Sequence, residues 1–398
     1  MIDARGILDR LGPMLVERAR AASDQVLAVR APARSEIAGN HTDQEGGRVI
    51  AGALDRSIEC LAVANNRMMA RVFSAGHEPV EIALDGLDPR PAERVTSAAL
   101  VRGMAAQLAG TGRTPAGFDL VMASDIPAGG GLSSSAAYEL ALCRALEALW
   151  PGRPIDAVEA AQMAQRVEQD WFGKPCGLMD QLAVSLGGLA YMDFASDVPK
   201  TQALPYDFAD HGLRLCLTDV GCDHSAYTDE YAAVPTEMRA VARTLGGERL
   251  GDVSEESLYQ RLGELRTQLG DRMVLRALHY WQEMELVDAR WEALCAGDLE
   301  RFLLLTERSG ASSAMFLQNV SVGASARQDA MVALALSTRL LRGHGATRIH
   351  GGGFGGSIQA FVPLKMLDAY QTGMDRLLGA GSCKAYRIST EGAQAQWL

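Results

Sequence analysis

Residues 124–138 read Ser-Asp-Ile-Pro-Ala-Gly-Gly-Gly-Leu-Ser-Ser-Ser-Ala-Ala-Tyr, and this stretch decides how the rest of the chain is interpreted. We expect a short strand at 118–123 to enter the glycine-rich turn, and a helix to begin among the serines and continue through Leu140 and Leu146. Such a turn presents unpaired backbone N–H groups and the positive end of a helix dipole at one spot, with hydroxyl groups beside them. The stretch is therefore a candidate phosphate-binding loop.

Glycine clusters also occur in ordinary strand-to-helix turns, where they only permit tight geometry. This loop lacks the lysine of a Walker motif, so it is not a P-loop. Its three consecutive serines, at 133–135, offer more capping groups than one helix needs. At least one hydroxyl is thus left to bind a magnesium ion, a cation that prefers oxygen ligands.

Composition limits the classes of protein to which the chain can belong. Its 398 residues suggest two domains, and a hydrophobic content of 48% is ample for well-packed cores. The net charge of −11 provides no basic field for nucleic acid or for an anionic membrane, so we expect neither as a partner. An acidic protein that handles an anionic nucleotide must supply positive potential locally, from helix ends, magnesium and a few basic side chains.

The cysteines and the first ten residues bear on location. Seven cysteines are scattered singly without a CxxC pair, which indicates reduced thiols and a cytoplasmic setting. Charged residues at positions 3, 5, 9 and 10 are incompatible with the core of a signal peptide, and no apolar run is long enough to cross a bilayer.

A second unusual stretch, at 31–50, reads Ala-Pro-Ala-Arg-Ser-Glu-Ile-Ala-Gly-Asn-His-Thr-Asp-Gln-Glu-Gly-Gly-Arg-Val-Ile. We expect it to be a polar loop between a short strand at 26–29 and strands in 54–82. Its side chains could simply be solvated. His41 and Asp43 resemble half of a metal site but have no third ligand nearby. Asn, His and Asp side chains offer both donors and acceptors, which suits a polyhydroxyl ligand such as a sugar.

Two acidic residues after the glycine loop are further candidates. Asp180 follows a Pro- and Gly-containing turn, where it could cap a helix or serve as the carboxylate of a site. Glu168 lies on a helix expected to begin at 155 and to end near 171–173. It could be an exposed acid, or a second oxygen ligand for magnesium beside the serine hydroxyls.

The second half of the chain is mostly helical, and we place a domain boundary near residue 196. The expected helices are 228–245, 255–269, 272–296, 298–309 and 325–343, after one at 92–109 in the first half. Strands at 347–350, 358–362 and 385–388 complete an α+β layer, and a glycine-rich hexad at 351–356 joins the first two.

Taken together, the ordered motifs resemble the galactokinase family of the GHMP kinases. The family motif PGRxNLIGEHTDYNGG is matched at Pro32, Arg34, Gly39, His41, Thr42, Asp43, Gly46 and Gly47. Its P-x-G-x-GLSSSAA loop is matched by 127–137, its catalytic PCGIMDQ by 175–181 and its TGAGFGG by 351 and 353–356. His224-Ser225 and Glu230-Tyr231 are similar to its H-S and E-Y pair. The resemblance spans nearly the whole chain.

The resemblance implies an α+β, two-domain GHMP kinase fold. The N-terminal domain (1–195) would contain a left-handed βαβ unit, the C-terminal domain (196–398) would be ferredoxin-like, and a cleft would lie between them. It also implies an ATP-dependent sugar 1-kinase, with galactose as the first candidate substrate.

Residue roles follow from the same resemblance. Asp180 would accept the proton of the anomeric hydroxyl, and Arg34 would keep Asp180 ionised and stabilise the transferring phosphoryl group. Ser135, or Ser134, and Glu168 would hold Mg²⁺. The ATP phosphates would lie on Gly129, Gly130, Gly131, Leu132, Ser133, Ser134, Ser135 and Ala136, and the sugar on Asn40, His41, Asp43, Gly177 and Tyr231.

These roles agree with the chemistry, because phosphoryl transfer needs in-line positioning and neutralisation of charge more than covalent help. A neighbouring arginine lowers a carboxylate's pKa, so we expect positioning to be the larger share of the work of Asp180.

The sequence departs from the family pattern at Ala33, Glu36, Asn40, Gln44, Glu45 and His350. Asn40 replaces a glutamate, which removes a charge that would repel a substrate with its own carboxylate. A kinase for galacturonate or another hexose is therefore an alternative, for which Arg48 could be a counter-charge unless it lies on the surface. A third interpretation is a non-catalytic ATP and sugar sensor, against which the retention of Arg34 and Asp180 argues.

Overall fold

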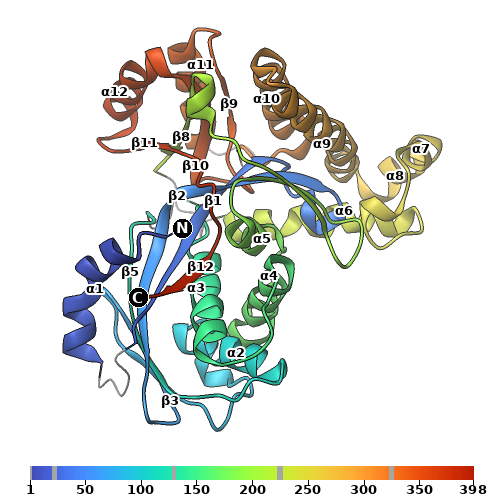
Figure 1. The fold of residues 1–398 in the computed structure, drawn as a ribbon. Coiled ribbons are helices and arrows are strands. Elements are labelled where there is room, and N and C mark those ends of the chain that lie inside the picture. Colours follow the sequence, from blue (N-terminus) through green and yellow to red (C-terminus); the bar gives the residue numbers. More distant parts are fainter. Residues whose placement is uncertain (1, 20–24, 128–130, 222–226, 322–326) are drawn as a thin grey trace.

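The computed structural model describes residues 2–19, 25–127, 131–221, 227–321 and 327–398, and two β-sheets organise it (Figure 1). The larger sheet has the order β12-β1-β2-β5-β3-β4, and β6 extends from β2 to β7. Its strands are β1 (Leu27–Ala38), β2 (Arg48–Ala64), β3 (Met69–Ser74), β4 (Val80–Ala83), β5 (Phe118–Ser124), β6 (Leu189–Asp193), β7 (Lys200–Leu204) and β12 (Gln394–Trp397).

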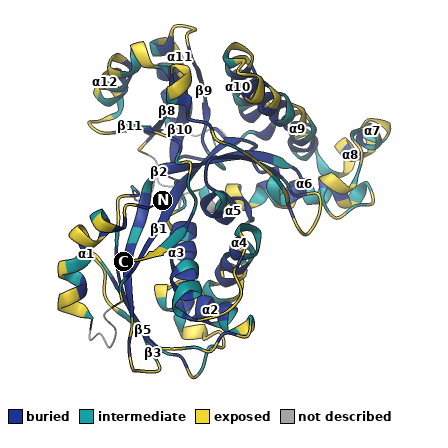
Figure 2. Ribbon diagram, viewed as in Figure 1, coloured by how far each residue is buried: buried dark blue, intermediate teal, exposed yellow. Residues whose placement is uncertain are grey.

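Helices cover both faces of this sheet, because successive side chains of a strand point to opposite faces. Leu27 and Val29 belong to the main core, whereas Ala28 between them packs in the cluster of α1. On the main-core side lie α2 (Ser97–Gly110), α3 (Ser134–Leu149), α4 (Ala157–Arg166) and α5 (Met179–Leu186), and on the other side lies α1 (Ala4–Arg18). Figures 1 and 2 show α1 on one side of the sheet and α2, α3, α4 and α5 on the other.

The smaller sheet has the order β11-β8-β10-β9, with all neighbouring strands antiparallel. The chain visits it as strand, helices, two strands, helix and strand, which is the ferredoxin-like path that the resemblance implies. Its elements are β8 (Leu213–Asp219), β9 (Ala346–Ile349), β10 (Ser357–Pro363) and β11 (Cys383–Tyr386), with α11 (Asp329–Leu341) and α12 (Leu367–Leu378) packed on one side.

The remaining helices stand between β8 and β9 in the chain and bridge the two sheets. The long helix α9 contacts α6, α8 and α10, and it also reaches β1 and β2 of the larger sheet. These helices are α6 (Thr228–Thr244), α7 (Glu255–Gln260), α8 (Leu262–Leu269), α9 (Asp271–Ala296) and α10 (Leu299–Ser312). In the part of the chain that the structure describes, every helix is too short or too polar to span a bilayer.

The polar loop expected at 31–50 is wrong at both ends, because residues 31–38 and 48–50 belong to strands. β1 continues through Ala38, so the residues at 34–36 lie within a strand paired with β2. Their polar groups are satisfied by residues far away in the sequence, including Asp180 and Gln359, and periodicity cannot reveal such partners.

Smaller differences concern the second half. The helix expected at 255–269 is two helices that meet at Arg261. The strand expected at 385–388 is β11, which begins two residues earlier. The helix α12 and the strand β12 were not expected. The parallel pair of β3 and β5, with α2 between them in the chain, supplies the expected βαβ unit, whose hand stays a prediction. β7 and β12 pair within the larger sheet although they follow residue 196, and the domain boundary stays a prediction.

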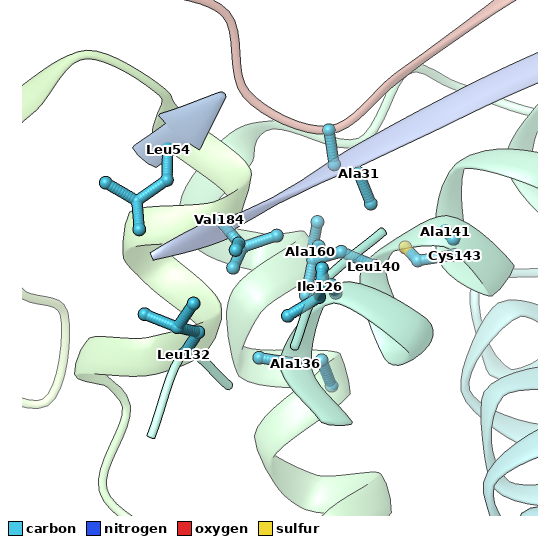
Figure 3. Close-up of a cluster of buried hydrophobic side chains, with 14 of the residues drawn as sticks. Ala31, Leu54, Ile126, Leu132, Ala136, Leu140, Ala141, Cys143, Ala160 and Val184 are labelled. Carbon is cyan, nitrogen blue, oxygen red and sulfur yellow. The ribbon is translucent and has the colours of Figure 1, made fainter. Parts of the chain in front are cut away.

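The packing under β1 predicts the effect of a core truncation. Leu140 on α3 is fully buried among Ala31, Ile126 and Val184 in the main core (Figure 3). We expect Leu140→Ala to lower the free energy of unfolding by about 2–5 kcal/mol, because it removes buried methyl groups and leaves a cavity. Urea denaturation followed by circular dichroism measures the change.

The control is Leu304→Ala on α10, where the side chain is 51% exposed and the same truncation should have little effect. Equal losses for the two variants would show that α3 is not a core helix.

Candidate functional site

A cavity of about 530 Å³ lies where the glycine-serine loop (131–135) meets the hairpin between β9 and β10. It gathers segments that are far apart in the sequence: the loop at 131–135, Arg34 from β1, Asp180 from α5, Tyr231 from α6, and the turn at 350–354. Eight of the fourteen predicted site residues that fall in the described ranges thus line one space.

Arg34 holds the glycine-serine loop in place. The Arg34 backbone N–H donates to the Leu132 carbonyl at 3.2 Å, and its guanidinium donates to the Gly131 carbonyl at 2.5 Å. Gly131 has a left-handed φ of 68°, and Ser133 has a φ of 56° immediately before α3 begins. The Ser133 hydroxyl does not cap that helix, and it donates to Asp180 instead. Ser134 and Ser135 line the cavity.

Two other loop predictions have different outcomes. Ala136 is fully buried one residue further along α3, where its side chain joins the main core. Gly129 and Gly130 lie outside the described residues, as do His224 and Ser225.

Arg34 and Asp180 form a bidentate ion pair at the cavity wall. The guanidinium Nε and one terminal nitrogen donate to the two carboxylate oxygens at 2.7 and 2.6 Å. Burial alone would raise the pKa of Asp180, but the attraction and hydrogen bonds of Arg34 outweigh it and hold the pKa below its usual value. Asp180 lies in the first turn of α5, where Leu178 is the N-cap, so the interpretation of Asp180 as a helix cap is wrong. It is an ionised hydrogen-bond acceptor facing the cavity.

Glu168 is buried, so its interpretation as an exposed acid is wrong. It lies in a π-helical turn (Val167–Phe172) and is 3% exposed. One carboxylate oxygen accepts from Lys174 Nζ at 3.0 Å and the other from Gln181 Nε2 at 2.8 Å. Lys174, unlike Glu168, lines the cavity.

A second carboxylate lies behind Glu168. Gln181 also donates to Glu139 at 3.2 Å, and the other oxygen of Glu139 has no hydrogen-bond partner among the described residues. Burial, reinforced by the charge of Glu168, raises the pKa of Glu139 well above its usual value. Buried carboxylates and the hydroxyl of Ser135 are the oxygen ligands that a hard cation such as Mg²⁺ prefers, so this donor set fits the predicted ion.

Asn40 and His41 do not line the cavity, and both have left-handed φ values, of 133° and 59°. The Asn40 amide is fully buried, donates to the Ser313 hydroxyl at 3.2 Å and accepts from Asn319 at 2.8 Å. His41 Nε2 bonds to the Gly352 carbonyl at 2.9 Å. Burial lowers the pKa of His41 to about 4, so the ring is neutral and Nε2 is the donor. Both residues fasten their turn to the second half of the chain.

Asp43, Gly177 and Tyr231 lie around the ion pair. A Cβ atom on Gly177 would lie 2.1 Å from Asp43 Oδ2, so these two residues touch. Burial raises the pKa of Asp43 to about 6, and the nearby charge of Asp180 adds to this effect. Tyr231 lines the cavity and packs its ring 5.0 Å from that of His41.

Two charged residues after Asp43 have partners outside the cavity. Glu45 is fully buried and accepts from the Leu250 N–H at 3.3 Å, and Arg239 Nε lies 3.3 Å from its other oxygen. This acid therefore docks the turn on α6 and its following segment. Arg48 pairs with Asp288, so it is not a free counter-charge.

Sequence reasoning assigned no site role to three residues near the ion pair. His350 lines the cavity and bonds to the hydroxyls of Ser35 and Ser357 at 3.0 and 2.9 Å. Glu36 is 5% exposed, and burial raises its pKa to about 7. Lys174 is the third. Each residue lies inside or beside a matched motif, and that position was the sequence feature that could have predicted its role. Its contacts, however, come from other segments.

Buried charges from the second half hold the end of β1 that carries these residues. Arg348 donates to the carbonyls of Ile37 and Gly39 at 3.5 and 3.1 Å, and Arg290 donates to that of Ile37 at 3.4 Å. Glu283 accepts from the Gly39 N–H at 3.3 Å and pairs with Arg290, and both side chains are completely buried. These charges satisfy backbone groups where the strand leaves the sheet.

We expect Glu283→Gln to destabilise the protein by about 3–5 kcal/mol, because it leaves Arg290 buried without its anionic partner. Urea denaturation is the measurement. Glu285→Gln, an exposed position on the same helix, is the matched control and should unfold like the wild type. A similar midpoint for all three proteins would contradict a role for this pair in holding β1.

Comparisons with known proteins cover nearly the whole chain. Residues 18–63 match the family model described as "Galactokinase galactose-binding signature", and residues 99–188 match the model of the GHMP kinases N terminal domain. A galactokinase of Streptomyces coelicolor is 30% identical over 368 residues, which is 90% of each chain. A galactokinase of Streptomyces lividans is also 30% identical over 368 residues, covering 90% of this chain and 87% of the relative.

Solved structures agree on the fold. The crystal structure of Lactococcus lactis galactokinase complexed with galactose superposes with a TM-score of 0.83 at 22% identity, covering 98% of this chain and 99% of that one. Methanococcus jannaschii mevalonate kinase gives a TM-score of 0.64 at 14% identity, covering 91% and 98%. These matches confirm the predicted α+β fold of the GHMP kinases.

Proposed function

Because this chain belongs to the galactokinase family of the GHMP kinases, we propose that it transfers the γ-phosphoryl group of ATP to the anomeric hydroxyl of galactose. The observation that carries the proposal is the bidentate pair of Arg34 and Asp180 on the wall of a cavity that the glycine-serine loop also lines. A phosphate loop, an arginine and an ionised carboxylate around one space are a sufficient set for phosphoryl transfer.

Asp180 would orient the anomeric hydroxyl by accepting its hydrogen bond, and it would receive the proton as the bond to phosphorus forms. Because Arg34 lowers the pKa of Asp180, the carboxylate is a weak base. A loose transition state requires little help with deprotonation, so alignment is its larger contribution. The Arg34 guanidinium would neutralise charge on the transferring group.

Ser135 and Glu168 would hold magnesium, with Ser134 as the alternative hydroxyl. When bound, the ion neutralises phosphate charge. The chain's own contribution is to keep Glu168 buried and oriented through Gln181, and to present backbone N–H groups at the start of α3 to the phosphates.

On the sugar side, Asp43, Gly177 and Tyr231 would form the contact surface, and Asn40 and His41 would support it from behind. A substrate carboxylate would meet Asp43 and Glu36 there, while Arg48 is already paired with Asp288. This charge pattern favours a neutral hexose over galacturonate, since specificity can rest on repulsion of the wrong substrate.

The location of the enzyme is part of the proposal. The cysteines in the described ranges are free thiols, which agrees with a reducing cytoplasm.

A sugar panel tests the substrate. Purified protein with ATP and magnesium is offered free hexoses, pentoses and uronic acids, and release of ADP is followed. Galactose should give the highest kcat/KM. A higher value with galacturonate would identify the uronate kinase, and nucleotide binding without ADP release from any sugar would support the sensor.

Replacing the carboxylate tests the role of Asp180. We expect Asp180→Asn to lower kcat by at least ~10²-fold, because the neutral amide loses the bidentate ion pair with Arg34 that aligns the acceptor oxygen and also cannot take up the hydroxyl proton. Steady-state kinetics with galactose measure the effect. Asp85→Asn, an exposed position outside the site, is the control. Turnover near that of the wild type would remove Asp180 from the mechanism.

The close approach of Gly177 to Asp43 gives a second kinetic prediction. Gly177→Ala would place its Cβ 2.1 Å from the present position of Asp43 Oδ2 and displace that carboxylate. Loss of a hydrogen bond to a charged group should raise KM for the sugar about tenfold, with the KM for ATP little changed.

The matched control is Gly110→Ala at the end of α2, where a Cβ meets nothing within 4 Å. An unchanged sugar KM in Gly177→Ala would mean that Asp43 does not contact the substrate.

A further inference from the structure

We propose that Lys174 binds the phosphates of the nucleotide and supplies the positive charge that the glycine loop, which has no lysine of its own, does not provide. The inference rests on the proposed function for the identity of the nucleotide.

The position of Lys174 is the first argument. It follows Gly173, which ends the π-helical turn of Glu168, and it precedes the segment that leads to Asp180. Its side chain lines the cavity together with Ser133, Ser134 and Ser135. The side chain is 59% exposed, so its ammonium group has room to move without opening the core.

The charge balance of the cavity is the second argument. The other cation among the described lining residues is Arg34, and Asp180 already neutralises it through two hydrogen bonds. A third guanidinium nitrogen donates to the Gly131 carbonyl. The ion pair thus adds no net charge, whereas a bound triphosphate brings several negative charges into a protein whose net charge is −11. Lys174 is the lining side chain that can offset them.

The present partner of Lys174 explains how the side chain becomes available. Its Nζ lies 3.0 Å from Glu168 Oε1, so the two charges neutralise one another in this structure. Glu168 is one of the residues that would hold a divalent cation, and a carboxylate that holds such an ion would no longer neutralise Lys174. The ammonium group of Lys174 could then leave Glu168 and pair with phosphate oxygens of the nucleotide.

The choice of residue type agrees with this exchange. The chain has only four lysines, at 174, 200, 365 and 384, in a total of 38 basic residues. Arginine forms planar bidentate pairs that hold one geometry, as Arg34 does with Asp180. A lysine is a compact charge on a flexible stem, which suits a group that changes partners.

Nucleotide binding without catalysis tests the proposal. Isothermal titration calorimetry with the non-hydrolysable analogue AMP-PNP and magnesium, in the absence of sugar, compares the wild type with Lys174→Met and Lys174→Arg. We expect Lys174→Met to weaken binding about tenfold, which corresponds to 1.4 kcal/mol, and Lys174→Arg to weaken it less. Lys200→Met, on the exposed strand β7, is the matched control and should bind like the wild type.

Adenosine, which carries no phosphate, separates a charge effect from a structural one. Its affinity should be the same for the wild type and Lys174→Met. A twofold or smaller change with AMP-PNP, or an equal loss with adenosine, would overturn the proposal. Because neither titration includes a sugar, failure of the sugar kinase assignment would leave this result unaffected.

Chemical labelling gives an independent readout. Pyridoxal phosphate followed by borohydride modifies accessible lysines, and peptide mass spectrometry locates them. ATP with magnesium should protect Lys174 while labelling of Lys200 continues. Equal labelling of Lys174 with and without ATP would also refute the contact.

Discussion

The bidentate pair of Arg34 and Asp180 is the interaction on which the site depends. It joins β1 to α5, and the remaining donors of Arg34 hold the phosphate loop through the carbonyls of Gly131 and Leu132. Ser133 completes the connection with its hydroxyl on Asp180. Three segments that are remote in the sequence, at residue 34, at 131–133 and at 180, are thereby fixed to one carboxylate.

Buried charges of the second half hold the backbone that follows Arg34. Glu283, Arg290 and Arg348 are completely or almost completely buried, and they bond to the backbone at 37–39, immediately after the strand segment that carries Arg34. Buried ions of this kind are costly unless they are paired and hydrogen-bonded. Their arrangement makes the geometry of the first-half site dependent on the folding of α9 and β9.

Local patterns were enough to predict most helices and strands and the turn before α3, because periodicity and turn chemistry depend on neighbouring residues. They did not predict α12 or the break between α7 and α8. The motifs also predicted Arg34, Asp180, Asp43 and Tyr231 as one group, and the cavity has them together or nearby. The extension of β1 was missed, since its polar residues looked unsuited to a strand.

Other features depend on partners that sequence spacing does not reveal. Asn40 faces Ser313 and Asn319 rather than the cavity, and Lys174 faces Glu168. Each of these positions is decided by tertiary packing, which brings side chains together from elements that are remote in the chain. A motif therefore identifies the residue types of a site more readily than the direction in which each side chain points.

The pairing of β12 with β1 has a consequence for biosynthesis. Residues 394–397 of β12 pair antiparallel with residues 27–30 of β1, the strand that also carries Arg34, and they cover that edge of β1 (Figure 1). During translation that edge stays uncovered until residues 394–397 leave the ribosome, while the rest of the sheet can already have formed. An uncovered strand edge is prone to pair with other chains. Nascent copies on one messenger are thus prone to associate through this edge in the interval before residues 394–397 emerge.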